Sequence, residues 1–198
     1  MKKLIRFTLL LIWSVTHVAV AGDKAPTMGE DGIYHYDWYH QSFLELADDV
    51  AEAQDEGKAV LVKFDQKGCI YCEKMALEVF SHPAIQNYLK EHYLVIQLDL
   101  FGNRDVTDID GETLAESEMA KRWGVLFTPT MYLVTGKKQG ASLPEISDAI
   151  MPGAFGKISF LGLLKWVKEG GPDTDETFQK YLSRTMSELR SALKASQT

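Results

Sequence analysis

Apolar and polar positions along the chain predict an alternation of strands and helices between residues 42 and 170. Short, nearly continuous apolar runs are typical of buried strands. Such runs lie at 58–64, 92–100 and 131–134, and a fourth run at 149–154 has the composition of an edge strand. Apolar residues at helical spacing predict helices over 42–56, 69–80, 83–89, 114–123 and 158–168. The pattern therefore indicates a single α/β domain.

Residues that begin and end helices support these boundaries. Ser42, followed by Glu45 three residues later, has the spacing of a helix N-cap, and Gly57 ends that helix. Ser81-His82-Pro83 marks the end of one helix and the start of the next. Pro129 lies directly before a strand, where it cannot donate to the sheet, and we therefore expect it at a special junction.

The two ends of the chain differ from this central region. Positive residues, an apolar run over 7–20 and small residues before Gly22 predict a signal peptide over 1–21, cleaved after Ala21. An uncleaved anchor is the alternative, but the run is short for a membrane span. We expect a leader over 22–42, mobile at its start, and the main domain over 43–171. A helical extension over 172–198 carries an apolar stripe, which packs on its own domain or forms a dimer contact.

Charge excludes two classes of partner. Removal of residues 1–21 takes away three positive charges and no negative ones, so the net charge changes from −7 to −10. Such an acidic protein has no electrostatic basis for binding nucleic acid or anionic lipid.

Residues 101–118 are rich in Asp, Gly and Thr. Because their ligand pattern for calcium is incomplete, we expect a solvated acidic loop. The signal peptide over 1–21 indicates export to a bacterial periplasm.

The two cysteines of the chain, Cys69 and Cys72, lie between a predicted strand and a predicted helix. A cysteine in the first turn of a helix lies beside unpaired N–H groups and the positive end of the helix dipole, which favour its thiolate. One helical turn brings Cys72 within disulfide distance. The spacing predicts Cys69 as the nucleophile and Cys72 as the resolving thiol.

Three other interpretations of this pair stay open: half a zinc site, a purely structural disulfide, and two inert thiols. Zinc would need further ligands, but no other cysteine follows and no histidines have paired spacing, so we interpret His35 and His40 as polar surface residues. A disulfide that closes so short a loop stabilises a fold only weakly. We therefore expect redox chemistry, with no metal and no bound cofactor.

The order strand, Cys-x-x-Cys, helix, strand, helix, Thr-Pro before a strand, edge strand and helix resembles the thioredoxin fold over about residues 43–170. The more detailed pattern Gly-Cys-x-Tyr-Cys-x-Lys-Met is most similar to the SoxW-like periplasmic thioredoxins. The resemblance implies a central mixed sheet flanked by helices. It also implies a cis peptide bond before Pro129 that faces the cysteines, and substrate contacts at Thr128, Pro129, Ile70 and Tyr71.

The chain departs from the family at one position. Thioredoxins usually carry a buried Asp six residues before the first cysteine, where it helps to move the proton of the resolving thiol, and this chain has Lys63 there. Either Glu73 or a water takes over the proton, or Lys63 lowers the thiol pKa as a nearby cation. A third interpretation is that Lys63 only extends outward to solvent.

The resemblance implies a periplasmic thiol–disulfide oxidoreductase. Because Ile70 and Tyr71 place no cation between the cysteines, unlike the Pro-His pair of DsbA-type oxidants, we expect a reductase of disulfides in exported proteins. Its electrons would come from a membrane thiol carrier of the DsbD or CcdA type. The alternatives are a disulfide isomerase or oxidase of the same fold, and a non-catalytic binding or assembly module.

Overall fold

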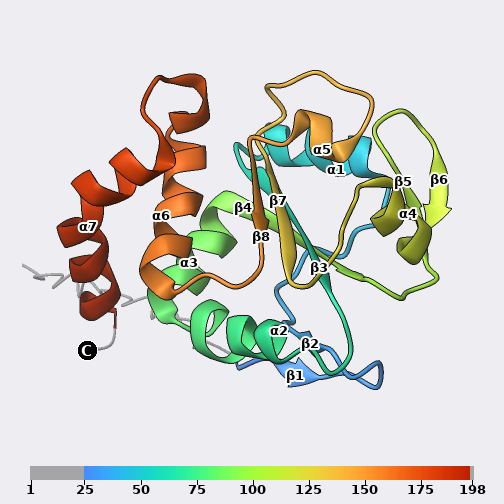
Figure 1. Cartoon of the computed structure of the whole chain (residues 1–198), viewed down its shortest axis with the longest axis horizontal. Coiled ribbons are helices and arrows are strands. Elements are labelled where there is room, and N and C mark those ends of the chain that lie inside the picture. Colours follow the sequence, from blue (N-terminus) through green and yellow to red (C-terminus); the bar gives the residue numbers. More distant parts are fainter. Residues whose placement is uncertain (1–24, 197–198) are drawn as a thin grey trace, which may run out of the picture.

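The computed structural model describes residues 25–196, so the predicted signal peptide and its cleavage point lie outside the described residues. Figure 1 shows the chain with α7 (Phe178–Ala195) at one end of the molecule and the hairpin of β5 (Asp105–Thr107) and β6 (Thr113–Ala115) at the other. Within residues 25–196, no helix is long and apolar enough to cross a membrane.

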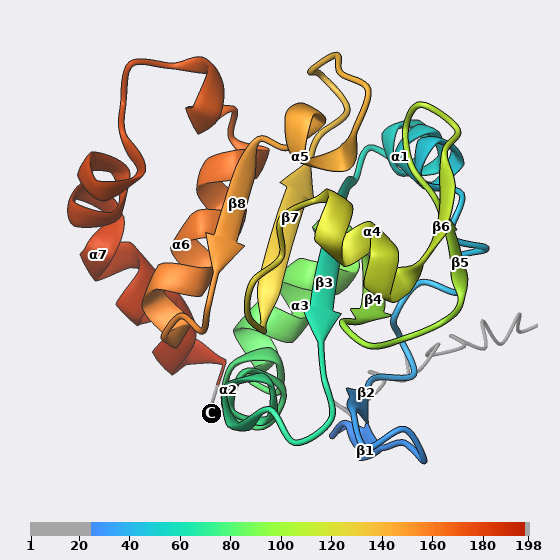
Figure 2. The ribbon, with the colours of Figure 1, turned by 45° about the vertical axis from the view of Figure 1, so that its right-hand side comes forward.

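A four-stranded mixed sheet in the order β4-β3-β7-β8 forms the centre of the domain (Figure 2). Its strands are β3 (Ala59–Asp65), β4 (Tyr93–Asp99), β7 (Thr130–Val134) and β8 (Ala149–Pro152). β3 pairs parallel with β4 and antiparallel with β7, which pairs antiparallel with β8. Every residue of β3 is buried, as expected for a central strand with a nearly continuous apolar run. The mixed sheet inferred from the resemblance is confirmed.

Helices cover both faces of this sheet and divide the core into two clusters. On one face, Val60, Val62 and Phe64 of β3 pack against α1 (Leu46–Asp55), α4 (Glu116–Arg122) and α5 (Leu143–Ile146). On the other face, Leu61 packs with η1 (Met75–Phe80), α3 (Pro83–His92) and α6 (Lys157–Lys168). α2 (Ile70–Lys74) leads directly into η1, which is a π-helix. The alternation of side chains along β3 therefore gives each face its own core.

The C-terminal helix packs on its own domain. After a short 3-10 turn, η2 (Gly171–Asp173), the chain forms α7 (Phe178–Ala195), which lies against α6. Tyr181, Leu189 and Leu193 are buried in this contact. Gly162 of α6 permits the close approach, because a Cβ there would lie 2.9 Å from Leu182 Cδ1. Of the two expectations for the stripe, packing within the chain is the one observed.

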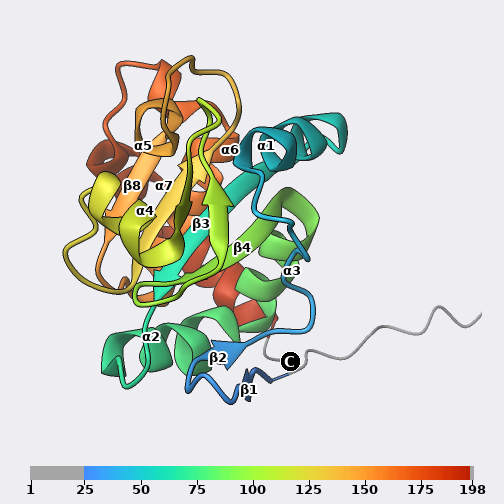
Figure 3. The same cartoon turned by 90° about the vertical axis from the view of Figure 1, so that its right-hand side faces the viewer.

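Residues 27–32, expected to be mobile, and residues 33–35, expected to lie on the domain, together form a small hairpin beside α2 (Figure 3). β1 (Thr27–Met28) pairs antiparallel with β2 (Tyr34–His35). The segment is anchored by buried Ile33 and by Tyr36, whose hydroxyl donates to the carbonyl of Ala76 at 2.8 Å. Aromatic side chains therefore hold the leader on the domain.

Two local predictions are wrong. α1 begins at Leu46 with Glu45 at the N-cap position, and Ser42 instead accepts a bond from the N–H of Leu44. The segment 101–118 contains the hairpin of β5 (Asp105–Thr107) and β6 (Thr113–Ala115) instead of a solvated loop. Its Asp108 is buried and accepts a bond from Trp123 Nε1 at 2.7 Å, which gives the acidic side chain a polar partner inside the fold.

Candidate active site

Cys69 and Cys72 lie at the amino end of α2, where the chain leaves β3. Cys69 is the N-cap residue of this helix, and its sulfur accepts a bond from the N–H of Cys72 at 3.0 Å. The two cysteines form a disulfide with their Cα atoms 5.2 Å apart. Cys69 is partly exposed whereas Cys72 is buried, with 6% of its surface accessible. This difference matches the predicted roles of an attacking and a resolving sulfur.

Gly68 makes the turn into α2 possible. Its φ angle is +73°, a backbone conformation that residues other than glycine rarely adopt. The turn places the amino end of the short helix directly after the last residues of β3. Unpaired N–H groups at this helix end favour a thiolate at Cys69 when the disulfide is reduced.

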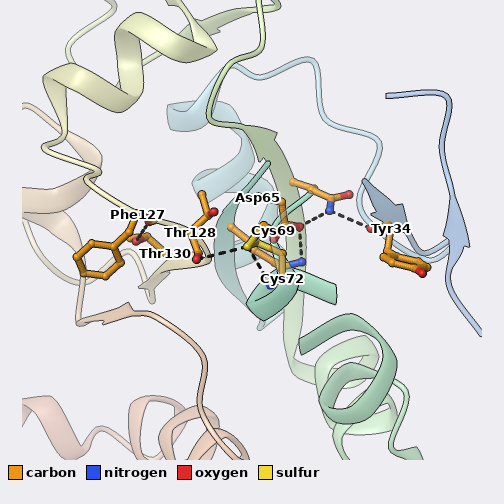
Figure 4. The surroundings of a disulfide bond; sticks show 9 residues. Tyr34, Asp65, Cys69, Cys72, Phe127, Thr128 and Thr130 are labelled. Carbon is orange, nitrogen blue, oxygen red and sulfur yellow. Dashed lines mark hydrogen bonds and ion pairs between the residues drawn. A yellow bond between two sulfur atoms is a disulfide. The ribbon is translucent and has the colours of Figure 1, made fainter. Parts of the chain in front are cut away.

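Thr128, which precedes Pro129, lies opposite the sulfur of Cys69 (Figure 4). The Thr128–Pro129 peptide bond is cis, and the carbonyl oxygen of Thr128 lies 3.5 Å from Cys69 Sγ. The pairing of Phe64 with Thr130 in the sheet brings the two segments together, because it aligns the end of β3 with the start of β7. The Thr130 hydroxyl donates to the carbonyl of Phe127 at 2.8 Å and closes the turn.

Exposed apolar side chains lie next to the site residues on α2 and on the loop before β7. Ile70 and Tyr71 follow Cys69 and expose 70% and 58% of their surfaces. Leu126 and Phe127 precede Thr128 and expose 85% and 52%. Sequence reasoning selected the first pair and missed the second, although both pairs directly adjoin a predicted site residue. Large exposed apolar side chains beside a reactive group are a feature of protein interaction sites.

Lys63 does not extend outward, so that interpretation is wrong. Its side chain is completely buried, and its ammonium forms an ion pair with Asp65 Oδ2. The Nζ atom also lies 5.2 Å from the centroid of the Phe80 ring. A buried ammonium needs an opposite charge, and Asp65 supplies it.

Asp65 is the residue that sequence reasoning missed. It is 1% exposed, and its Oδ2 atom accepts bonds from Lys63 Nζ and from Gln97 Nε2. Its Oδ1 atom has no hydrogen-bond partner among residues 25–196. One signal was available, because Lys63 and Asp65 are the two charged residues of an otherwise apolar strand and their spacing of two places them on one face.

A small cavity of about 80 Å³ is lined by Asp65 and by both cysteines. Its other wall comes from the N-terminal hairpin, with Met28, Ile33 and Tyr34. The Tyr34 hydroxyl donates to Glu73 Oε1 at 3.4 Å, and desolvation together with the Glu73 charge raises the pKa of Tyr34. Glu73 is thus an exposed residue on the cavity wall that binds the hairpin.

A family model described as a thioredoxin-like domain matches residues 46–153, more than half of the chain. The chain belongs to the thioredoxin-like domain family. The match spans all four strands of the central sheet and both cysteines. No protein in the curated collection matches the chain.

Several solved structures are similar to this thioredoxin-like chain. A thioredoxin-fold protein from Helicobacter pylori is 18% identical, with a TM-score of 0.48, over 71% of this chain and 85% of that one. A thioredoxin from Thermus thermophilus is 26% identical, with a TM-score of 0.47, over 62% and 83%. A protein described as DsbH oxidoreductase is 12% identical, with a TM-score of 0.44, over 75% and 95%.

Proposed function

We propose that this thioredoxin-like protein is a periplasmic reductase of disulfides in exported proteins, of the SoxW-like type. The observation that carries the proposal is the position of Cys69, which is partly exposed at a helix N-terminus and 3.5 Å from the carbonyl of Thr128. An attacking sulfur needs access to its partner and a stabilised thiolate; partial exposure supports the first condition and the helix N-terminus supports the second.

The reaction begins with the reduced dithiol. The Cys69 thiolate attacks one sulfur of a partner disulfide, so a Cys69–partner bond forms and the partner's own S–S bond breaks. The released partner sulfur takes a proton from water. Cys72 then loses its proton and attacks Cys69, which forms the Cys69–Cys72 disulfide and expels the second partner sulfur. The partner gains two electrons and the Cys69–Cys72 pair loses two.

Asp65 accepts the proton of Cys72 in the second step. The carboxylate and Cys72 line the same cavity, and the Oδ1 atom is uncommitted among the described residues. Lys63 and Gln97 hold Oδ2 and so fix the carboxylate in the wall of the cavity. Thioredoxins usually carry a buried carboxylate at the position of Lys63. In this chain Asp65 supplies the negative charge, and Lys63 stabilises it. The cavity offers the proton a route to solvent.

Partner segments dock on these exposed apolar side chains of α2 and of the loop before β7. An extended chain that pairs with the backbone at Thr128 would pass Ile70 and Tyr71 on one side and Leu126 and Phe127 on the other. Electrons return to the protein from a membrane thiol carrier of the DsbD or CcdA type. Two alternatives are a disulfide isomerase or oxidase, and a binding module whose cysteines have no catalytic role.

Reduction of insulin with dithiothreitol as the electron source tests the enzyme class. We expect turnover by the wild type and none by Cys69→Ser. Absence of turnover, with both thiols titratable in the reduced protein, would favour the binding module. The equilibrium potential of the Cys69–Cys72 pair tests the direction, because a value near the DsbA potential of about −120 mV would indicate an oxidase.

A further inference from the structure

His40, Asp49 and Glu52 form a cluster of metal-ligating groups separate from the cysteines. Asp49 and Glu52 are three residues apart on α1 and share one face of that helix. His40 comes from the segment before the helix, and its backbone N–H donates to the carbonyl of Val95 at 2.9 Å. One donor atom from each residue lies within 4.8 Å of the other two. Sequence spacing did not reveal the cluster, because the histidine stands alone before the helix.

The distances within this cluster differ from those of hydrogen bonds. His40 Nε2 lies 3.4 Å from Asp49 Oδ1 and 3.6 Å from Glu52 Oε2. Hydrogen bonds between nitrogen and oxygen are shorter, at about 2.7 to 3.2 Å. Two ligands of one tetrahedral zinc ion, each about 2.0 to 2.2 Å from the metal, lie about 3.4 Å apart. The two distances from His40 therefore match the spacing of ligands on one ion, and the donor atoms of all three residues lie within 4.8 Å of one another.

A further side chain orients the Asp49 carboxylate. The Ser42 hydroxyl donates to Asp49 Oδ2 at 2.7 Å, and the Ser42 oxygen accepts the N–H of Leu44 at 2.6 Å. Leu44 has a φ of +64° and is the one residue other than glycine with a positive φ in the described part of the chain. With Oδ2 occupied, Oδ1 is the atom that faces His40. Carboxylates that bind metals are commonly held in this way by an outer hydrogen bond.

Burial and charge also suit a divalent cation. The side chains of His40 and Asp49 are 17% and 6% exposed, whereas that of Glu52 is 50% exposed and leaves the cluster open on one side. A neutral imidazole and two carboxylates carry two negative charges, which one divalent ion neutralises.

We propose that His40 Nε2, Asp49 Oδ1 and Glu52 Oε2 bind one zinc-type divalent cation, with its fourth position open to solvent. The ion connects the segment that follows the N-terminal hairpin to α1. This site is independent of the proposed reductase function, because none of its ligands lines the cavity of the cysteines.

Zinc titration of the untagged, oxidised protein tests the site, since the disulfide removes both thiols as competing ligands. We expect one zinc ion per chain by calorimetry and a zinc-dependent rise in melting temperature that a chelator reverses. His40→Gln should abolish both effects. Ser42→Ala should weaken binding by about 10-fold, as loss of an outer hydrogen bond does at other sites.

His35→Gln is the matched control, because His35 forms an ion pair with Asp31 at 2.9 Å and belongs to no cluster of three metal-ligating groups among residues 25–196. It should leave zinc binding unchanged. Should His40→Gln fold poorly, Glu52→Gln on the exposed side of α1 supplies the same test. Zinc binding that survives both substitutions, or no binding by the wild type, would overturn the proposal and leave the cluster as a set of ion pairs.

Discussion

Replacement of Asp65 by Asn removes the proposed proton acceptor while keeping the shape of the side chain. Oδ1 has no hydrogen-bond partner among the described residues, and Asp65 lines the cavity that also contains both cysteines. A positioned general base contributes about 100-fold or more to a rate. We therefore expect the attack of Cys72 on the mixed disulfide to slow by about 100-fold, or about 2.7 kcal/mol of barrier.

Stopped-flow reaction of the reduced protein with one equivalent of dithiobis(nitrobenzoate) separates the two steps. The first release of thionitrobenzoate reports attack by Cys69, and the second reports resolution by Cys72. Asp65→Asn should slow the second phase and change the first by less than about threefold, or about 0.6 kcal/mol. Asp99→Asn is the matched control, because Asp99 lies opposite Asp65 in the register of β3 and β4 but does not line the cavity.

Stability must be controlled in this experiment. Asn at position 65 leaves the Lys63 ammonium buried without its counter-charge, at a cost of about 3 to 5 kcal/mol. That loss is large beside a typical unfolding free energy of about 5 to 15 kcal/mol. The double variant Lys63→Met with Asp65→Asn removes both charges and should regain stability while resolving as slowly as the single variant. A folded variant of either kind whose second phase is as fast as that of the wild type would refute the role of Asp65.

Three further predictions concern docking and the core. Phe127→Ser should raise the KM for insulin and leave the rate of attack of Cys69 on a small disulfide unchanged, because it removes exposed apolar surface and no reacting atom. An unchanged KM would count against docking of the partner at Phe127. Leu189→Ala should lower the unfolding free energy by about 2 to 5 kcal/mol in urea titration, since its side chain fills the α6–α7 contact; a negligible change would mean that α7 packs loosely. Trp123→Phe should lower the unfolding free energy by about 1 to 3 kcal/mol, because it leaves Asp108 Oδ2 without its indole donor. An unchanged unfolding free energy would show that Arg122, whose Nε lies 3.3 Å from the same oxygen, is a sufficient partner for Asp108.

Periodicity predicted the central sheet and most helices because those elements bury continuous or regularly spaced apolar residues. The run at 58–64 became the fully buried β3, and the stripe after residue 172 became α7. Short elements were missed for the opposite reason. The β1–β2 hairpin and the β5–β6 hairpin have few apolar residues of their own and are fixed by distant contacts, such as the bond from Tyr36 to Ala76.

The same limit applied to the candidate site. The cysteine spacing and the Thr128–Pro129 pair identified the reacting centre, because both are local motifs. Asp65 was missed since its significance depends on Gln97 in a neighbouring strand and on the hairpin that closes its cavity. Lys63 was identified as a departure from the family pattern, yet its burial followed only from the pairing with Asp65.

Covalent trapping tests the central claim most directly, namely that Cys69 is the accessible sulfur through which electrons pass to partner proteins. Reduced Cys72→Ser and Cys69→Ser proteins, incubated with insulin, would be resolved by non-reducing electrophoresis and mass spectrometry. We predict that Cys72→Ser accumulates a mixed disulfide at Cys69 and that Cys69→Ser forms none. Equal trapping by the two variants, or trapping at Cys72 alone, would contradict the account.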